Sequence, residues 1–210
     1  MILNPEGQTL TENYKLLTGA IVPRPIAFVS TVSANGVLNL APFSFFTGIT
    51  SQPPTVCFAP GRYADTGGKK DTLQNIEATK EFVVNIVTES IAHEMNVTAT
   101  EFPEEVDEFE VTGLTPAESR VVKPPRVLES PINFECKLEQ IVQVGPEGPG
   151  GGALVIGRVV LFHVQDDLID ARKRIDHARL QPVGRLAGMS YTKLGEQFAL
   201  VRPKYQKASN

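Results

Sequence analysis

Hydrophobic and polar positions alternate over short stretches of this chain, and the stretches follow one another closely. Apolar, β-branched and aromatic residues dominate them, a composition typical of β-strands. They cover residues 26–32, 37–41, 55–59, 82–87, 132–144 and 153–165. The last two are long enough to form an antiparallel ribbon. Gly145–Gly152, between them, predicts a hairpin tip; it is no phosphate loop, because no Gly-Lys-Ser/Thr follows.

Turn residues support hairpin connections elsewhere. Asn35-Gly36 predicts a tight turn between the first two stretches, since both residues tolerate positive φ. Neither a βαβ alternation nor a GxGxxG after a strand occurs, which argues against a dinucleotide-binding sheet. The pattern therefore predicts a mainly β single domain over residues 1–210, built as a closed antiparallel barrel with a few attached helices.

Helical signals are fewer. Residues 71–80 predict a helix that buries Leu73 and Ile76, with Asp71 or Thr72 as its cap. Other segments give weaker signals. One or two helical turns are expected in 11–18, and a weak helix is expected in 89–96. Residues 101–110 are expected to form an acidic surface excursion, residues 177–191 to be irregular, and residues 109–114 and 197–203 to form short strands.

Composition and charge exclude several classes of protein. Hydrophobic residues make up 41% of the chain, enough for a real core, and 20 basic against 24 acidic residues argue against a nucleic-acid or anionic-membrane surface. No apolar run reaches transmembrane length and the N-terminus does not resemble a signal peptide, so a cytoplasmic protein is expected. Cys57 and Cys136 predict buried thiols rather than a disulfide or zinc site.

Catalytic signatures of hydrolases and metalloenzymes do not occur in the sequence. His93, His163 and His177 lack metal-ligand spacing, and His163 is expected to be a core or interface residue. No GxSxG is present. The acidic run Glu104–Glu108 is expected to be a solvated face.

The richest stretch for ligand binding is 42–47, which is crowded with rings and hydroxyls. Pro42 removes a ladder donor, so this segment is not expected to be a central strand, and its wall suits a flat, mostly apolar ligand with polar edges. An anion cradle is a second candidate. It combines Ser30, Thr31 and Ser33 with Lys69 and Lys70, placed just before the expected helix start. The alternative is that these hydroxyls and lysines are ordinary surface residues and Asp71 an ordinary cap.

Five segments in order resemble one family, the flavin reductase-like FMN-binding split barrels, in particular the flavoredoxin-like branch. The resemblance covers about three-quarters of the chain. They read PRPIAFVST from Pro23, NLAPFSFFTGIT from Asn39, KDTLQNI from Lys70, EFVVNIV from Glu81 and HARLQPVGRLAGMSYTKLGE from His177. The resemblance implies a six-stranded antiparallel split β-barrel that forms a homodimer and holds one FMN per subunit.

The resemblance also implies site residues. Arg24, Ser30 and Thr31 would approach the FMN phosphate and ribityl end, and the segment from Asn39 to Phe45 would run along the isoalloxazine. Lys70, Asp71 and Thr72 would complete the phosphate site, with the loop from Arg185 to Tyr191 over the cofactor. The full set that it implies is Arg24, Ser30, Thr31, Asn39, Leu40, Ala41, Pro42, Phe43, Ser44, Phe45, Lys70, Asp71, Thr72, Arg185 and Tyr191.

The implied activity is reduction of flavin by NADH or NADPH, with electrons passed to free flavin, a ferric complex or a partner oxygenase. Such hydride transfer needs neither a protein nucleophile nor a metal. Three alternatives stay open: an FMN electron carrier reduced by another protein, a pyridoxamine-phosphate oxidase-like activity, and a barrel without cofactor. Neither the nicotinamide preference nor the final acceptor follows from the sequence.

Overall fold

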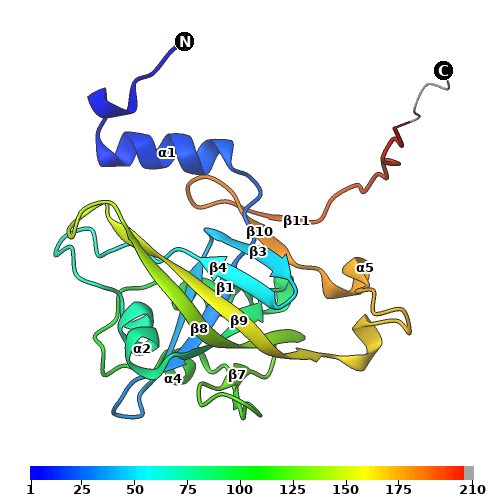
Figure 1. Ribbon diagram of the computed structural model, residues 1–210. Coiled ribbons are helices and arrows are strands. Elements are labelled where there is room, and N and C mark those ends of the chain that lie inside the picture. Colours follow the sequence, from blue (N-terminus) through cyan, green and yellow to red (C-terminus); the bar gives the residue numbers. More distant parts are fainter. Residues whose placement is uncertain (206–210) are drawn as a thin grey trace.

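The computed structural model describes residues 1–205, and its centre is one antiparallel sheet of seven strands (Figure 1). Their order across the sheet is β2-β1-β5-β8-β9-β4-β3. The strands are β1 Ala27–Val32, β2 Leu38–Phe43, β3 Phe46–Ser51, β4 Pro54–Phe58, β5 Glu81–Ile86, β8 Ile132–Val144 and β9 Gly152–Val164. The predicted mainly β architecture and the long β8–β9 hairpin are confirmed.

The sheet curls into a barrel that is split along one seam. β2 and β3 occupy opposite ends of the strand order, yet only Ser44 and Phe45 separate them in the chain. Two residues span little distance, so the two sheet edges must come close together. β3 is the strand beyond the expected six: its mixed sequence FTGITS carries no apolar alternation, and nearly all of it is exposed.

Pro42 is tolerated inside β2 because β2 is an edge strand. The Leu40 N–H points away from β1, where it donates to the Glu108 carboxylate. Successive N–H groups along a strand alternate in direction, so position 42 also faces outward. The missing donor of Pro42 therefore costs no ladder hydrogen bond.

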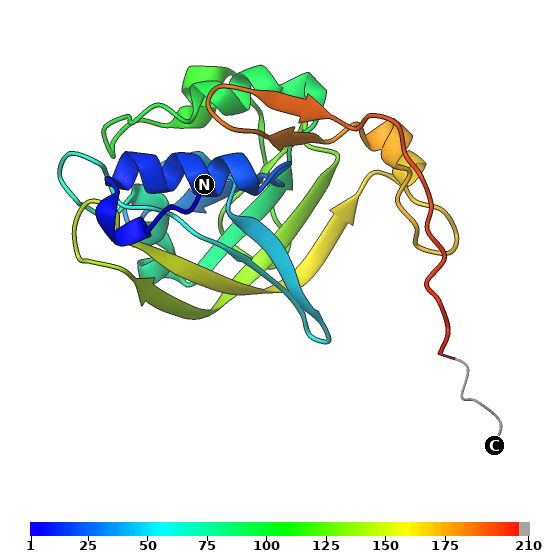
Figure 2. The same ribbon diagram turned by 90° about the horizontal axis from the view of Figure 1, so that it is seen from above.

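Helices and short strands surround the barrel, and Figure 2 shows α1 lying across it when the molecule is seen from above. The helical elements are η1 Pro5–Gly7, α1 Leu10–Ala20, α2 Asp71–Thr79, η2 Glu89–Ile91, α3 Ala92–Val97, α4 Glu108–Thr112, η3 Asp166–Leu168 and α5 His177–Leu180. The short strands are β6 Pro116–Ala117, β7 Arg126–Val127, β10 Val183–Arg185 and β11 Tyr191–Lys193. In residues 1–205, no helix has the length and apolar character needed to cross a membrane.

Two expectations for weaker segments are wrong. The strand expected at 109–114 is a helix, α4, because Asp107 caps its start and Gly113 ends it at φ 72°. No strand forms in 197–203, where Phe198, Leu200 and Val201 are largely exposed. The helix expected at 11–18 is longer than expected, since a capping box between Thr9 and Glu12 begins it.

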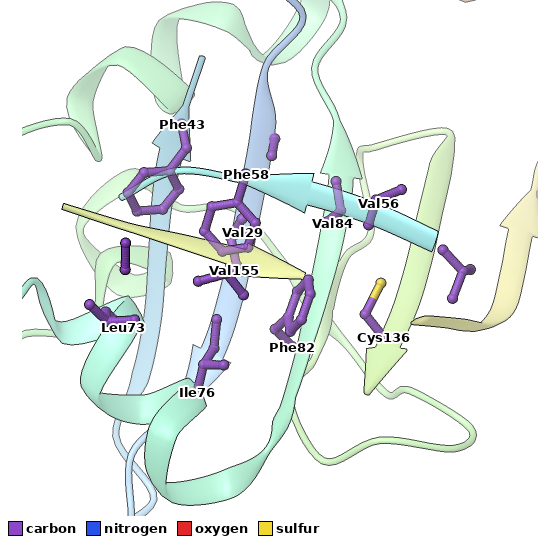
Figure 3. Packing of buried hydrophobic residues seen from close by; sticks show 13 residues of the cluster. Val29, Phe43, Val56, Phe58, Leu73, Ile76, Phe82, Val84, Cys136 and Val155 are labelled. Carbon is purple, nitrogen blue, oxygen red and sulfur yellow. The ribbon is translucent and has the colours of Figure 1, made fainter. Parts of the chain in front are cut away.

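The main core fills the barrel between the sheet and α2 (Figure 3). Phe58 packs against Phe43 at 5.1 Å and against Phe82 at 5.5 Å between ring centroids. Leu73 and Ile76 of α2 are buried against these rings, as the sequence predicts. The core thus fixes α2 firmly beneath β2, which positions the start of the helix.

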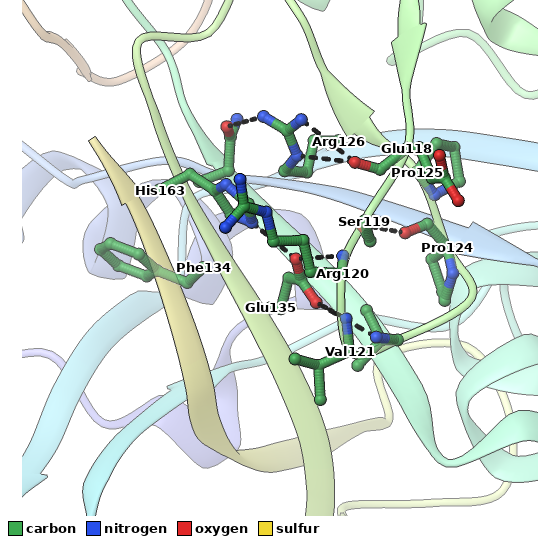
Figure 4. A network of polar contacts seen from close by, with 12 residues as sticks. Glu118, Ser119, Arg120, Val121, Pro124, Pro125, Arg126, Phe134, Glu135 and His163 are labelled. Atoms are coloured by element: carbon green, nitrogen blue, oxygen red, sulfur yellow. Dashed lines mark hydrogen bonds and ion pairs between the residues drawn. The ribbon is translucent and has the colours of Figure 1, made fainter. Parts of the chain in front are cut away.

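A second buried feature attaches the connector 118–125 to the barrel wall (Figure 4). Glu135 of β8, fully buried, accepts the N–H groups of Arg120, Val121 and Val122 at 2.6–3.1 Å. His163 of β9 lies 2.6 Å from the same carboxylate through Nε2. Burial raises the pKa of Glu135, but these donors lower it more, and the net pKa lies below the ordinary value. His163 is only partly buried and belongs to none of the hydrophobic clusters, so the structure gives it no core position.

Candidate functional site

A cavity of about 140 Å³ opens at the outer edge of β2. β2 supplies one wall and the first turn of α2 another, while Tyr63 and the loop 98–102 close the sides. The lining residues include Asn39, Ala41, Pro42, Phe43, Tyr63, Lys70, Asp71, Thr72, Glu101, Phe102 and Glu108. Seven of the residues that the resemblance implies therefore meet in one place: Asn39, Ala41, Pro42, Phe43, Lys70, Asp71 and Thr72.

The start of α2 differs from the sequence expectation in a way that matters for anions. The N-cap is Lys70, which makes no side-chain capping bond, and neither Asp71 nor Thr72 is the cap. Asp71 instead accepts the Tyr63 hydroxyl at 3.2 Å through Oδ2. An uncapped helix start keeps N–H groups and positive dipole charge available to a ligand. The Asp71 carboxylate therefore does not occupy these donors, as an ordinary cap would.

Lys70 lies at the mouth of the cavity between an aromatic ring and an acid. Its Nζ is 4.4 Å from the centroid of the Tyr63 ring and 3.1 Å from Glu101 Oε1. Both side chains of the Lys70–Glu101 pair are partly exposed, so this ion pair is weak. Lys70 can exchange Glu101 for an incoming anion at little cost.

Amide and hydroxyl groups form a buried chain behind the cavity. Asn39 Nδ2 donates to Thr31 Oγ1 at 3.1 Å and to Thr72 Oγ1 at 2.9 Å, and Asn75 Nδ2 also reaches Thr31 Oγ1 at 3.1 Å. All four residues are buried. The chain ties β1, β2 and α2 together, so it fixes the start of α2 relative to the β2 edge.

Glu108 is a site residue that the sequence analysis missed. It begins α4 and is only 7% exposed, although the acidic run was expected to be a solvated face. Its Oε2 accepts the Leu40 N–H at 2.9 Å. Burial, with smaller contributions from Asp71 and Asp107, raises the pKa of Glu108 to about 7. The signal that was available is Asp107, a capping residue followed by Phe109 and Val111 as apolar positions of a short helix.

Arg24 does not join this cavity. Its guanidinium donates to the carbonyls of Thr18, Ile21 and Leu186 at 2.6–3.0 Å and to Ser44 Oγ at 3.2 Å. The residue precedes β1, whereas Thr31 at the far end of that strand lies beside the cavity. Ala27 and Thr31 are already about 13 Å apart at roughly 3.3 Å per residue. Arg24 is therefore not part of the cavity that Lys70 lines, and its expected approach to the FMN phosphate stays a prediction.

A second group of the implied residues gathers around Arg24, at the other end of the seam. Phe45 is partly exposed, with the Arg24 guanidinium 5.9 Å from its ring centroid. Arg185 pairs with Arg24 through backbone hydrogen bonds and places its guanidinium 4.4 Å from the Tyr191 ring. The implied set thus extends along the β1–β2 ladder: the cavity lining runs from Asn39 to Phe43, and Arg24 with Ser44 lies just beyond Phe43.

Ser30 and Leu40 face the opposite side of the sheet. The Ser30 hydroxyl is buried and donates to the carbonyl of Pro125, so it is not near the cavity. Leu40 packs with Phe28 in the second core cluster and contributes only its N–H, which Glu108 occupies. Strand alternation explains both placements, because Thr31 and Asn39, one residue away, face the cavity side.

The donor set and the shape of the seam suit an elongated ligand with an anionic end. The α2 start and Lys70 offer donors for an anion, while Ala41, Pro42 and Phe43 form an apolar wall. The enclosed volume of about 140 Å³ is below the roughly 300 Å³ of a typical ligand pocket. The cavity can therefore enclose one end of such a ligand, while the rest would extend along the open β2 edge.

Comparison with known proteins identifies relatives over almost the whole chain. Nitrilotriacetate monooxygenase component B from Bacillus cereus is 45% identical, with a TM-score of 0.91 over 95% of this chain and 98% of that one. The 2-nitrobenzoate 2-nitroreductase NbaA of Pseudomonas fluorescens is 31% identical, with a TM-score of 0.86 over 100% of both chains. A protein with a split barrel domain from Shewanella frigidimarina is 22% identical, with a TM-score of 0.82 over 97% of this chain and 100% of that one.

The last of these likenesses concerns the fold alone and confirms the split barrel. The first two extend to sequence, and both cover essentially complete chains. Residues 19–179 match the family described as flavin reductase like domain. That range holds every strand of the large sheet and all residues that line the cavity at the β2 edge. The chain therefore belongs to the flavin reductase like domain family.

Proposed function

We propose that this protein is an FMN-binding, NADH- or NADPH-dependent flavin or ferric reductase that passes electrons to a small acceptor or a partner oxygenase. The observation that carries the proposal is the cavity at the β2 edge, which joins an apolar wall to an uncapped helix start in a chain of this family. The likeness to component B of a monooxygenase supports the oxygenase as one acceptor.

The residues have separate roles in this proposal. Lys70 and the first N–H groups of α2 hold the FMN phosphate, and Thr72 is fixed there by its bond from Asn39. The β2 edge from Ala41 to Phe43 supports the flat ring. FMN would supply the chemistry of hydride acceptance and onward electron transfer. The protein residues bind and orient, and none of them needs to act as a nucleophile.

We also propose that the protein works as a homodimer. α1 buries only Thr18, and Tyr14 and Leu17 remain more than half exposed on an 11-residue helix. A helix of that length is marginal in water without packing. β3, with five of its six residues exposed, offers a further uncovered surface next to the seam. Light scattering that gives a monomer mass over a wide concentration range would contradict the dimer.

The experiment that tests the function is an anaerobic spectrum. We expect the purified protein to carry FMN or to bind it with micromolar or tighter affinity, about 8 kcal/mol. Addition of NADH or NADPH alone should bleach the flavin absorbance. Retention of FMN without bleaching would instead indicate an electron carrier reduced by another protein. Absence of FMN retention would end the proposal.

A second candidate function is reduction of a small nitroaromatic compound. Its support is the 31% identity with a 2-nitrobenzoate 2-nitroreductase over complete chains. After bleaching by NADH, anaerobic addition of 2-nitrobenzoate or of a ferric complex distinguishes the two acceptors. The acceptor that restores the oxidised flavin spectrum faster is the better substrate.

A further inference from the structure

Glu108 is a buried carboxyl without a cation, in a cavity where we place a phosphate. Its Oε2 accepts the Leu40 N–H at 2.9 Å, and its own backbone N–H is a further donor to the carboxyl group. No ion pair of Glu108 forms within residues 1–205. A buried, unpaired carboxylate is costly, and such a group prefers its neutral form.

The charged neighbours of Glu108 make that preference stronger. Asp107 on its own helix and Asp71 on α2 are acids, and Glu101 from the facing loop also lines the cavity. Tyr63 contributes a neutral hydroxyl, already bound to Asp71. Lys70, the cation of the cavity wall, is paired with Glu101. Ionisation of Glu108 would therefore add a further negative charge to a lining in which two other acids already face one lysine.

We propose that Glu108 is a ligand-binding residue of this cavity that acts in its protonated form, donating its O–H to the anionic end of the bound molecule. The inference rests on the proposed function, since the phosphate of FMN is the anion. Protonation removes one negative charge from the cavity and converts an acceptor into a donor, so both effects favour the phosphate. The proton comes from solvent and is taken up as the ligand binds.

This role makes FMN affinity depend on pH through a residue of the protein. The raised pKa of Glu108, about 7, means that the protonated form is already present near neutrality. Above that pH, FMN must either bind against a charged Glu108 or bind together with a proton. Riboflavin shares the ring but lacks the phosphate, so its affinity should not follow the same dependence.

The test is a titration of FMN and riboflavin into flavin-free parent, E108Q and E104Q at about pH 6 and about pH 8. The amide introduced by E108Q keeps an acceptor for the Leu40 N–H and stays neutral, whereas Glu104 is an exposed residue of the same acidic run. The phosphate itself ionises with a pKa of about 6, equally for every variant. For each protein, the affinity for FMN is divided by the affinity for riboflavin at both pH values. Between about pH 6 and about pH 8, we expect this ratio to fall about tenfold more in the parent and E104Q than in E108Q. The reason is that a group with a pKa of about 7 is almost fully ionised at pH 8.

Calorimetry in two buffers of different protonation enthalpy provides the second measurement. The parent should take up more protons per FMN bound than E108Q at about pH 7.5. Equal pH dependence and equal proton uptake in parent and E108Q would overturn the inference while leaving the proposed function intact. A pH dependence of riboflavin that equals that of FMN would also overturn it. Failure of every variant to bind FMN would instead contradict the proposed function.

Discussion

Glu108 and Glu135 are two buried glutamates of this protein, one beside β2 and the other on β8, and their carboxyl groups have opposite electrostatic situations. Glu135 receives three backbone N–H groups and the His163 ring, and its pKa is lowered. Glu108 receives the Leu40 N–H amid other acids, and its pKa is raised to about 7. Burial acts on both carboxyls in the same direction, so the number of donors decides the difference.

The comparison separates a structural carboxylate from a ligand-facing one. The protein supplies hydrogen-bond donors to both carboxylate oxygens of Glu135. These hydrogen bonds attach the connector 118–125 to β8 (Figure 4). The chain leaves Glu108 incompletely satisfied beside a cavity, where another molecule can supply the missing partner. Perturbed carboxyls in clefts are candidates for function for this reason, while fully bonded ones are structural.

The largest expected effect comes from removing the Glu135 charge. Glu135→Gln puts an NH2 group against backbone N–H donors and leaves buried groups unpaired, so we expect a loss of about 3–5 kcal/mol in the free energy of unfolding. Glu139→Gln is the matched control on the same strand. Its partner Arg158 is 3.0 Å away and about half exposed, which predicts a loss below about 1 kcal/mol. Urea unfolding of the three proteins provides the measurement.

The pH dependence of this stabilisation has a definite sign. Because the folded pKa of Glu135 is lowered, its contribution is present above the unfolded value of 4.5 and is lost as pH falls through the folded value. The difference between parent and Glu135→Gln should therefore shrink in acid. A difference that stayed constant down to about pH 3 would mean that Glu135 stabilises by packing and not by charge.

Lys70 provides the next largest effect, on binding and not on stability. Loss of a hydrogen bond to a charged group costs roughly 1.5–3 kcal/mol, so Lys70→Ala should weaken FMN binding about 10- to 100-fold. Riboflavin affinity should barely change. High salt should weaken FMN binding to the parent more than to the variant, since part of the attraction is screened.

Lys69 is the matched control for Lys70. It is the preceding residue in the chain, but its Nζ pairs with Glu77 at 2.7 Å and it is absent from the cavity wall. Lys69→Ala should leave both affinities nearly unchanged. Equal losses for FMN and riboflavin in Lys70→Ala would show that Lys70 supports the fold or the ring wall. No loss for either ligand would make it an ordinary surface residue.

The sequence predicted the barrel well because strands follow local alternation. β8 and β9 were predicted to within a residue at each end, and the Gly145–Gly152 turn joins them as expected. β3 was missed since its exposed faces carry no alternation. Such a strand is determined by its pairing with β4, a contact that the local sequence does not encode.

The candidate site was predicted less completely, because the positions of its residues depend on strand register and on the face to which each side chain points. The structure brings Lys70 and Asn39 together at one cavity, whereas Arg24 lies beyond the Ala27 end of the β1–β2 ladder, a separation that the sequence does not show. Strand alternation places Ser30 and Thr31 on opposite faces of β1, and the sequence does not show which of the two faces the cavity. Glu108 was missed since composition alone classifies an acidic run as solvent-facing.

The smallest expected effect is on the free energy of unfolding of E108Q. The pH dependence of the Glu108 contribution has the opposite sign to that of Glu135. The unfolded Glu108 ionises near 4.5, whereas the folded group keeps its proton until about pH 7. Between these values the folded state binds more protons, so the contribution of Glu108 is present below 4.5 and declines as pH rises to about 7. E108Q, which stays neutral, escapes this decline. Its stability relative to the parent should therefore rise by about 1–2 kcal/mol between about pH 5.5 and pH 7, at 1.36 kcal/mol per pKa unit.

Urea unfolding of flavin-free parent and E108Q at these two pH values measures the change directly. Because every other titrating group is common to both proteins, the difference between them isolates Glu108. Under the same conditions the difference between parent and Glu135→Gln should stay nearly constant, since that carboxyl is ionised throughout. If E108Q instead lost stability as pH rose, Glu108 would be a satisfied carboxylate like Glu135. The cavity would then lack the proton donor on which the binding of the phosphate is proposed to depend.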